Sequence, residues 1–273
     1  MSQPATTGEP TPVIELKDLH VHHRARSGKA FRPLIVKAVN GVNFSVGRSE
    51  TVGIVGESGC GKSTLANVLV GLQPPTSGEV IFRGKTALKR TAALRKEFGR
   101  SVSVVFQDPS TALNARMQVR DILMDPLVVH GIGTSASRSK KASDLLGLVG
   151  LPASAGAAVP NQLSGGQRQR VAIARALALD PDIIVADEPT SALDVSVRAQ
   201  VLNLLSDLKA ELNLGMVFIS HDIRTVRYVS DRICVMNAGQ IIEEGPAAQV
   251  FDAPTNDYTR KLLGAAPSLV HAG

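Results

Sequence analysis

The chain has 273 residues, of which 44% are hydrophobic and 20% charged, a balance typical of a globular protein with a sizeable core. Aromatic residues make up only 3% and Trp is absent, which argues against a surface that stacks many rings on bases or sugars. The formal net charge is +6, but Lys and Arg are scattered, so we expect no nucleic-acid partner.

The first part of the chain alternates polar and apolar residues in short segments. Residues 1–12 are polar and rich in Pro, which predicts a disordered N-terminus. Strand-like segments follow at 13–16, 36–39, 42–46 and 79–82, with a polar, basic insert at 24–33. Their alternation predicts an antiparallel sheet.

Four further apolar runs are short, β-branched and nearly continuous, as expected for strands of a parallel sheet that is buried on both faces. They lie at 51–55, 102–106, 183–186 and 216–219. Helical patterns separate them. After the first run, apolar residues recur at helical spacing at Leu65, Val68, Leu69 and Leu72, and 191–212 carries a similar stripe.

The remaining segments complete the predicted architecture. Residues at about 108–170 contain helical patterns, such as 119–129 and 142–149, and we expect them to form a helical subdomain inserted into the core. Runs at 233–236 and 240–243 predict a hairpin, and 258–263 predict a helix. The predicted class is α/β, with a mainly parallel sheet, an N-terminal antiparallel β-subdomain and a helical insertion.

A phosphate-binding loop follows the first buried run. Residues 56–63 match G-x-x-x-x-G-K-[ST] between a predicted strand and helix, the context of a P-loop NTPase. Its glycines allow successive N–H groups to surround an anion, and the helix dipole adds to this. We expect Lys62 to reach the β- and γ-phosphates and Ser63 to bind Mg²⁺. The predicted nucleotide-binding residues are Gly56, Glu57, Ser58, Gly59, Cys60, Gly61, Lys62, Ser63 and Thr64.

The other three buried runs each end in polar residues, namely Gln107, Asp187-Glu188 and Ser220-His221. Ligands of open α/β sheets lie at the carboxyl ends of strands, so these side chains should share one edge with the phosphate loop. There Asp187 fits a Mg²⁺ ligand and Glu188 a base for the attacking water. Singly, an Asp-Glu pair is more often a helix cap and a His more often structural; their common position favours a function.

A second anion site is predicted at residues 163–167, with the sequence LSGGQ. Glycines open a helical stretch there and provide N–H donors, but the segment has no lysine. The predicted contacts come from Ser164, Gly165, Gly166 and Gln167. Because only the first site has a Lys and Mg²⁺ ligands, we predict a head-to-tail dimer in which this segment closes over the partner's nucleotide.

In order and spacing, these motifs resemble those of the ABC-transporter ATPases. The motifs are the phosphate loop, Gln107, 163–167, 185–190, 191–194 and His221. The resemblance implies the ABC ATPase fold over 13–245. It also implies that Gln107 joins the Mg²⁺ site to the permease contact, that Asp194 couples two nucleotide sites, and that His221 senses the γ-phosphate.

A closer resemblance is to the ATP-binding subunits of dipeptide, oligopeptide and nickel importers. It rests on 106–114, 194–200 and 254–263, and implies a C-terminal helix and tail of that type over 246–273. Asn256-Asp257 stands where His-Pro is usual in that branch. With only Cys60 and Cys234, the chain lacks the cysteine cluster that some of these subunits carry.

The contact to the adenine base is less well defined. Members of the family usually stack the base on an aromatic residue upstream of the phosphate loop. The matching position is His23 or His22, and Phe31 in the basic insert is another candidate. An imidazole offers a smaller stacking face than the usual ring.

The resemblance implies ATP and Mg²⁺ as cofactors and ATP hydrolysis that powers peptide import. Import of nickel or another small solute, and a non-transport ABC ATPase, are alternatives; a monomeric P-loop kinase or GTPase would leave LSGGQ without a purpose. The implied partners are transmembrane permease subunits, a second ABC ATPase subunit, identical or different, and indirectly an extracytoplasmic solute-binding protein.

The expected location is the cytoplasmic face of the cell membrane. The N-terminus has no signal-peptide pattern, and no apolar run approaches the roughly 18 residues needed to span a bilayer. Cys60 and Cys234 do not provide a disulfide framework, and free thiols suit a reducing compartment.

Overall fold

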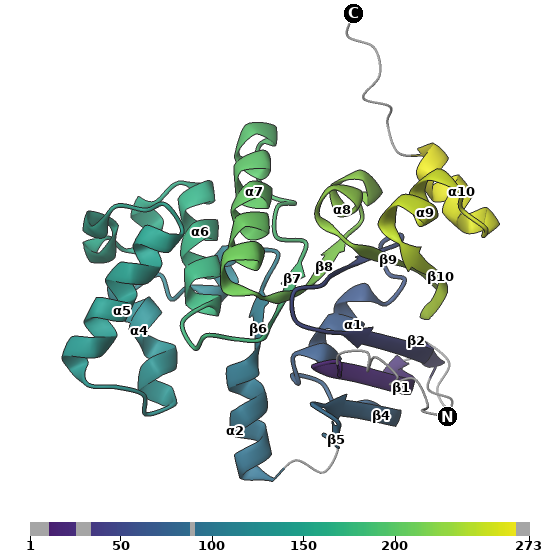
Figure 1. Cartoon of the computed structure of the whole chain (residues 1–273), viewed down its shortest axis with the longest axis horizontal. Coiled ribbons are helices and arrows are strands. Elements are labelled where there is room, and N and C mark those ends of the chain that lie inside the picture. Colours follow the sequence, from purple (N-terminus) through teal and green to yellow (C-terminus); the bar gives the residue numbers. More distant parts are fainter. Residues whose placement is uncertain (1–10, 26–33, 88–90, 266–273) are drawn as a thin grey trace, which may run out of the picture.

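An antiparallel sheet forms the N-terminal part of the chain, which the computed structural model describes over residues 11–25, 34–87 and 91–265 (Figure 1). Its strands are β1 (Ile14–Ala25), β2 (Leu34–Val46), β4 (Ser77–Phe82) and β5 (Lys85–Thr86), in the order β2-β1-β4-β5. The predicted antiparallel sheet is confirmed. The predicted insert begins inside β1, and its residues 26–33 lie outside the described residues, as do residues 1–10 of the N-terminus predicted to be disordered.

The second sheet has six strands in the order β10-β9-β3-β8-β7-β6. They are β3 (Thr51–Val55), β6 (Val102–Val105), β7 (Ile183–Asp187), β8 (Gly215–Ser220), β9 (Arg232–Asn237) and β10 (Gln240–Pro246). All neighbours are parallel except β10, which forms the predicted hairpin with β9. The parallel sheet is confirmed, and β9 extends it by pairing with β3, which the sequence analysis did not predict.

The strands of the second sheet are buried on both faces because alternate side chains enter two different hydrophobic clusters. In β8, Val217 and Ile219 pack with α1 and the antiparallel sheet, while Met216 and Phe218 pack with the helices on the opposite face. Each such side chain contributes roughly 1.5–3 kcal/mol by leaving water. The continuous apolar runs thus hold the sheet between two layers.

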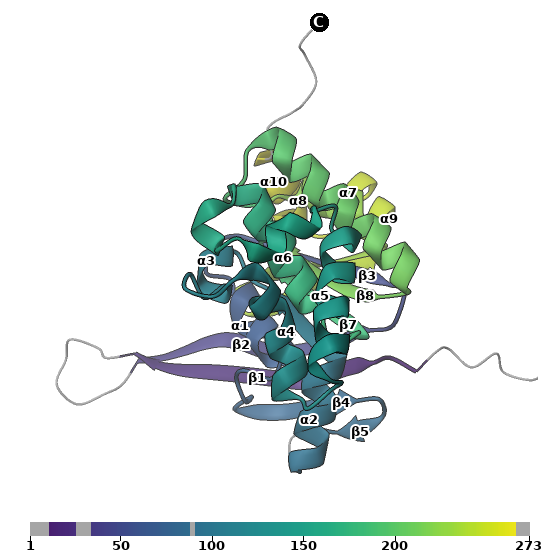
Figure 2. The ribbon, with the colours of Figure 1, turned by 90° about the vertical axis from the view of Figure 1, so that its left-hand side faces the viewer.

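Helices cover both faces of the second sheet (Figures 1 and 2). They are α1 (Lys62–Leu69), α2 (Ala92–Ser101), α3 (Pro109–Ala112), α4 (Val119–Val129), α5 (Ser135–Leu148), η1 (Ala153–Ala157), η2 (Pro160–Gln162), α6 (Gly165–Ala176), α7 (Val195–Leu212), α8 (Ile223–Val229), α9 (Ala247–Asp252) and α10 (Asp257–Ala265). None of the described helices is long and apolar enough to cross a membrane.

The residues of the predicted helical insertion form α3 to α6, of which α4, α5 and α6 lie apart from the antiparallel sheet in Figure 1. Helix α4 has the predicted bounds, whereas α5 begins earlier than predicted because Thr134 and Ser137 form a capping box. Helix α1 is shorter than predicted, and Leu72 lies beyond its end with an exposed side chain. The domain boundaries at 12, 245 and about 108–170 stay predictions.

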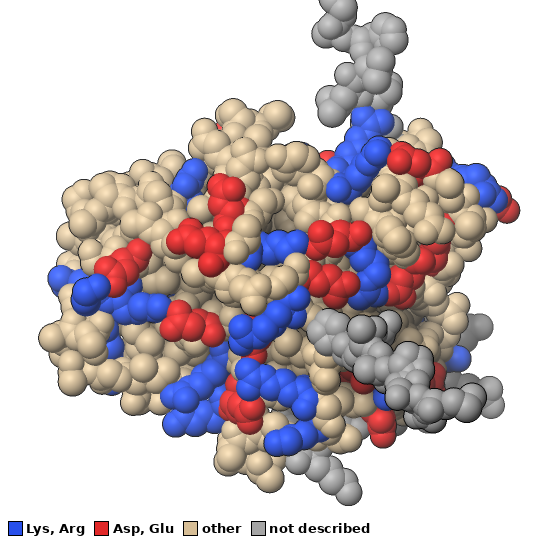
Figure 3. All heavy atoms as spheres, viewed as in Figure 1, with Lys and Arg blue, Asp and Glu red and all other residues tan. Residues whose placement is uncertain are grey.

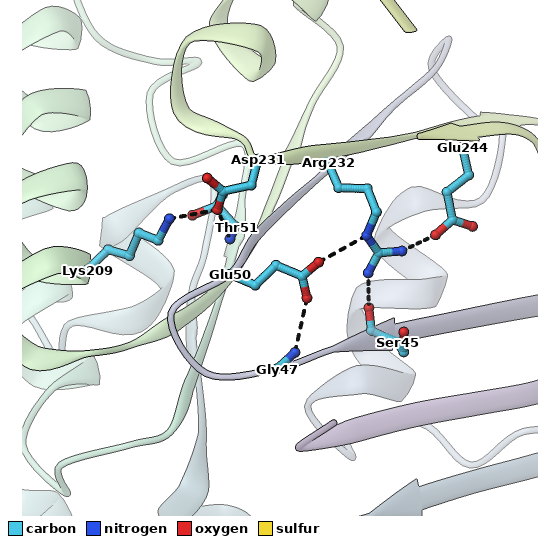
Figure 4. Close-up of polar contacts among 8 residues, drawn as sticks. All are labelled: Ser45, Gly47, Glu50, Thr51, Lys209, Asp231, Arg232 and Glu244. Carbon is cyan, nitrogen blue, oxygen red and sulfur yellow. Dashed lines mark hydrogen bonds and ion pairs between the residues drawn. The ribbon is translucent and has the colours of Figure 1, made fainter. Parts of the chain in front are cut away.

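A cluster of polar contacts joins the two sheets near the start of β3 and β9 (Figure 4). The guanidinium of Arg232 donates to Glu50 Oε1 at 3.0 Å, to the Ser45 carbonyl at 2.7 Å and to Glu244. Glu50 in turn accepts from the Gly47 N–H at 3.2 Å. These contacts link β2, β9, β10 and the β2–β3 turn. The Arg232 side chain is only 22% exposed, so the contacts are partly shielded from water.

Replacing Arg232 by Ala is expected to lower the free energy of unfolding by about 2 kcal/mol, because Glu50 and the Ser45 carbonyl lose a charged donor. Urea unfolding monitored by circular dichroism measures this. Lys140→Ala, which removes an exposed pair with Asp144, is the control and should leave the midpoint nearly unchanged. Equal midpoints for the two variants would contradict the role given to Arg232.

Candidate nucleotide-binding site

The phosphate loop connects β3 to α1 and depends on close backbone packing. Gly59 and Gly61 have φ of 82° and 112°, in the left-handed region that favours glycine. A Cβ on Gly61 would lie 2.0 Å from the Ala38 carbonyl oxygen of β2, so no other residue fits there. The Gly239 N–H, in the β9–β10 turn, donates to the Cys60 carbonyl at 2.8 Å. The loop is thus held from two sides by β2 and this turn.

Lys62 is buried and its ammonium group folds back onto its own loop. Nζ donates to the Gly56 carbonyl at 2.7 Å and to the Glu57 carbonyl at 2.9 Å. Neutral carbonyls are weaker partners for an ammonium group than phosphate oxygens are. The loop therefore keeps its cation ready for an anionic ligand.

The register of the parallel strands brings the predicted site residues to one edge. Val55 lies opposite Ser220, and Asp187 lies opposite Ile219. Beyond this edge is a cavity of about 570 Å³. Its lining includes Ser58, Gly59, Cys60, Gly61, Lys62, Ser63, Thr64, Gln107 and Glu188. The ends of these strands therefore lie beside the phosphate loop, as expected.

Asp187 has the features of a cation ligand. Its Oδ1 atom is buried and has no hydrogen-bond partner among the described residues. Burial raises the pKa of this carboxyl above its usual value; a hydrogen bond from Ser63 opposes the rise, and the nearby Glu188 adds to it. A partly buried carboxylate with an unused oxygen beside a hydroxyl fits the hard oxygen ligands that Mg²⁺ prefers.

Glu188 is held in an unusual backbone conformation with φ of 47°. Its N–H donates to the Ile219 carbonyl at 2.9 Å, and its own carbonyl accepts from Ser191 N at 3.2 Å and Oγ at 3.1 Å. These bonds hold the backbone of Glu188, a residue that lines the cavity, and its Oε2 lies 3.1 Å from His221 Nδ1. Such a conformation costs roughly 1–3 kcal/mol and is typical of functional sites.

The segment 163–167 lies at the start of α6, in the helical part of the chain (Figure 1). Ser164 Oγ accepts from the Gln167 N–H at 3.2 Å, and Gln167 Oε1 accepts from the Ser164 N–H at 2.9 Å, which is a capping box. Ser164 is exposed. None of the described residues that line the phosphate cavity belongs to this segment, so one chain does not bring the two predicted anion sites together.

The candidates for the base contact are not gathered at the cavity. His23 is exposed on β1, His22 is partly buried beside it, and Phe31 lies outside the described residues. Val36 on β2, which pairs with His23, lines the cavity instead. A stacking role for His23 stays a prediction.

Several residues that contact the loop or line its cavity were not predicted from the sequence. Lys37 and Ala38 of β2 and the Ala238-Gly239 turn line the cavity, and Tyr258 on α10 accepts a hydrogen bond from the Glu57 N–H at 3.2 Å. Each is distant from the loop in sequence and reaches it only through the fold.

Comparison with known proteins identifies relatives along most of the chain. A family model described as ABC transporter matches residues 39–191. The chain is 44% identical over 258 residues to the dipeptide transport ATP-binding protein DppF of Escherichia coli (strain K12), covering 94% of this chain and 77% of the relative. It is also 44% identical over 264 residues to the oligopeptide transport ATP-binding protein AppF of Bacillus subtilis (strain 168), covering 96% and 80%.

A solved structure is similar over most of its length. This is a dimeric ATP-binding cassette in a post-hydrolysis state bound to ADP and Pi, with a TM-score of 0.74 and 33% sequence identity. The match covers 86% of this chain and 98% of that one.

Because Asp187 ionises in a partly buried position where its Oδ1 atom has no partner among the described residues, Asp187→Asn is expected to raise the free energy of unfolding of the nucleotide-free protein, on the order of 1 kcal/mol. The folded-state pKa lies above the unfolded one, so this carboxyl favours folding at acid pH and its contribution is lost as pH rises through the folded value. The gain of the variant should therefore grow from pH 4 to pH 7 in thermal unfolding. A variant less stable than the parent at pH 7 would contradict this.

Proposed function

The chain belongs to the ABC transporter family and is an ATP hydrolase of that family, and from this premise we propose that it powers the import of peptides. The relatives named for dipeptide and oligopeptide transport support the substrate class. The observation that carries the catalytic part is the position of Glu188, which lines the same cavity as the phosphate loop.

The proposed chemistry assigns one role to each group at the edge of the sheet. The loop N–H groups and Lys62 bind the β- and γ-phosphates, and Glu188 accepts a proton from the attacking water. His221, whose Nδ1 lies 3.1 Å from Glu188 Oε2, contacts the γ-phosphate. Ser63, Gln107 and Asp187 would hold Mg²⁺. When bound, this cation neutralises charge that develops on the phosphate oxygens.

The proposed active unit is a dimer with a nucleotide at each of two interfaces. Ser164, Gly165, Gly166 and Gln167 are the residues proposed to contact the partner's γ-phosphate. Their position at the start of α6, where Ser164 is exposed and the other three are partly exposed, lies apart from the phosphate cavity of their own chain and supports this arrangement. The dimeric relative with ADP and Pi supports it as well. The second ATPase subunit is either identical or different.

A surface for transmembrane permease subunits is proposed next to Gln107. A cavity of about 150 Å³ lies between β6 and the helical part, and its lining includes Phe106, Ala112, Pro126 and Arg175. Phe106 directly precedes Gln107, so a segment inserted there would be one residue from the phosphate cavity. This contact would hold the chain at the cytoplasmic face of the membrane, with a solute-binding protein acting indirectly from the other side.

The charge distribution favours this function over a nucleic-acid-dependent ATPase. On the face seen in Figure 3, Lys and Arg alternate with Asp and Glu and do not form a basic stripe. A nickel or other small-solute importer remains the second candidate, because the ATPase machinery would be the same.

Glu188→Gln is expected to lower ATP turnover at least about 100-fold, because an amide is not a proton acceptor, while MgATP binding is retained. Size-exclusion chromatography of this variant with its companion subunit and MgATP should detect a stable dimer, and Ser164→Ala added to it should weaken that dimer. Rapid steady-state hydrolysis by Glu188→Gln would overturn the proposed role.

Cells in which the chain carries Lys62→Ala are expected to lose uptake of radiolabelled di- and oligopeptides, because the phosphate cradle loses its cation. Uptake of radioactive nickel is measured in the same cells. Loss of nickel uptake with normal peptide uptake would replace peptide import by the second candidate.

A further inference from the structure

The C-terminal helix α10 touches the phosphate loop through one side chain. The Glu57 N–H donates to Tyr258 Oη at 3.2 Å, across 201 positions of sequence. The carbonyl of the same residue accepts from Lys62 Nζ at 2.9 Å and from the Cys60 N–H at 3.3 Å. The N–H of Glu57 is therefore bonded to Tyr258, and its carbonyl is bonded to the ammonium group of Lys62.

Tyr258 is fixed from its own side by the start of α10. Its N–H donates to Asn256 Oδ1 at 2.9 Å, and the Arg260 N–H donates to the Asn256 carbonyl at 3.1 Å, so Asn256 acts as the N-cap of the helix. The ring of Tyr258 packs at the margin of a hydrophobic cluster. Asn256, which departs from the usual sequence of the importer branch, thus caps α10 in this chain.

The start of α10 is anchored in turn to the second sheet. Glu243 on β10 accepts from Thr255 N at 2.6 Å, Thr255 Oγ1 at 2.9 Å and the Asn256 N–H at 3.1 Å. Strand β10 pairs with β9, whose turn to β10 also holds the loop through Gly239. The Tyr258 hydroxyl is therefore presented to the loop by a rigid support.

We propose that Tyr258 is a positioning residue for the phosphate loop and couples nucleotide binding to helix α10. Lys62 must leave the Glu57 carbonyl to reach a phosphate, and at that moment Tyr258 retains the Glu57 N–H and keeps the loop open as a cradle. The inference rests on ATP binding by this loop, but not on peptides as the cargo. By linkage, a contact that favours nucleotide binding is itself strengthened by the nucleotide.

The test compares Tyr258→Phe with Tyr228→Phe in the full chain. Tyr258→Phe keeps the ring and removes only the hydroxyl group, which accepts from the Glu57 N–H. It should raise the KM for MgATP roughly two- to tenfold, the size of one hydrogen bond, with kcat changed less than twofold. Tyr228 is 68% exposed and bonds Asn203 at 3.1 Å, so Tyr228→Phe should change neither constant.

Two further measurements detect the coupling itself. MgATP should slow hydrogen exchange of the amides of 257–265 in the parent chain and in Tyr228→Phe, but not in Tyr258→Phe. Because the chain has two Tyr and no Trp, Tyr228→Phe leaves Tyr258 as the remaining tyrosine emitter, and MgATP should change its fluorescence.

The outcomes separate this inference from the proposed function. If Tyr258→Phe lowers kcat or the melting temperature at an unchanged KM, or if MgATP leaves exchange in α10 unaltered in the parent, the coupling is wrong and the ATPase assignment stands. If the parent chain itself fails to bind MgATP, the proposed function fails. Glu243→Gln tests the same coupling by weakening the support of α10. It should raise the KM for MgATP, and the KM of the double variant Glu243→Gln/Tyr258→Phe should not exceed that of Tyr258→Phe.

Discussion

The in-register parallel pairing of β3, β8 and β7 is the constraint on which the site depends. Val55 faces Ser220 and Asp187 faces Ile219, so the groups that follow these strands emerge at one level. Side chains alternate between faces with a period of two, and both faces of these strands are packed in hydrophobic clusters. A slip by one residue would exchange the two faces and carry Asp187 away from Ser63. Burial of the apolar strands therefore fixes the geometry of the polar edge.

Several groups at that edge are held in states that do not favour stability. Asp187 has an oxygen without a partner among the described residues, Lys62 is bonded to carbonyls and a thiol rather than to an anion, and Glu188 has a positive φ. Each arrangement costs free energy in the nucleotide-free chain. The two packed clusters and the polar contacts around Arg232 offset this cost and keep the groups in place. A ligand with phosphates and a cation would satisfy them together, which is the physical reason to expect tight coupling between binding and conformation.

Contacts to the phosphate loop converge from regions far apart in sequence. Ala38 on β2 lies against Gly61, the β9–β10 turn bonds Cys60, and α10 bonds Glu57. Three elements, namely β2, the β9–β10 turn and α10, thus contact the loop. The segment 163–167, in contrast, lies at the start of α6 and does not line the phosphate cavity. One chain therefore has the phosphate loop at one place and the helix start proposed to contact a partner's nucleotide at another, an arrangement that suits closure of two subunits.

The sequence by itself determined the class of fold, the parallel and antiparallel sheets and the residues of the phosphate loop, because each depends on a local pattern: continuous apolar runs, alternation, or glycines at fixed spacing before Lys62. Helices α2, α8 and α9 were not predicted. The strained Glu188, the pairing of β9 with β3 and the Tyr258 contact were decided only by the tertiary structure. Each depends on contacts between residues that are many positions apart in the sequence, and a local sequence pattern does not show which of these residues meet.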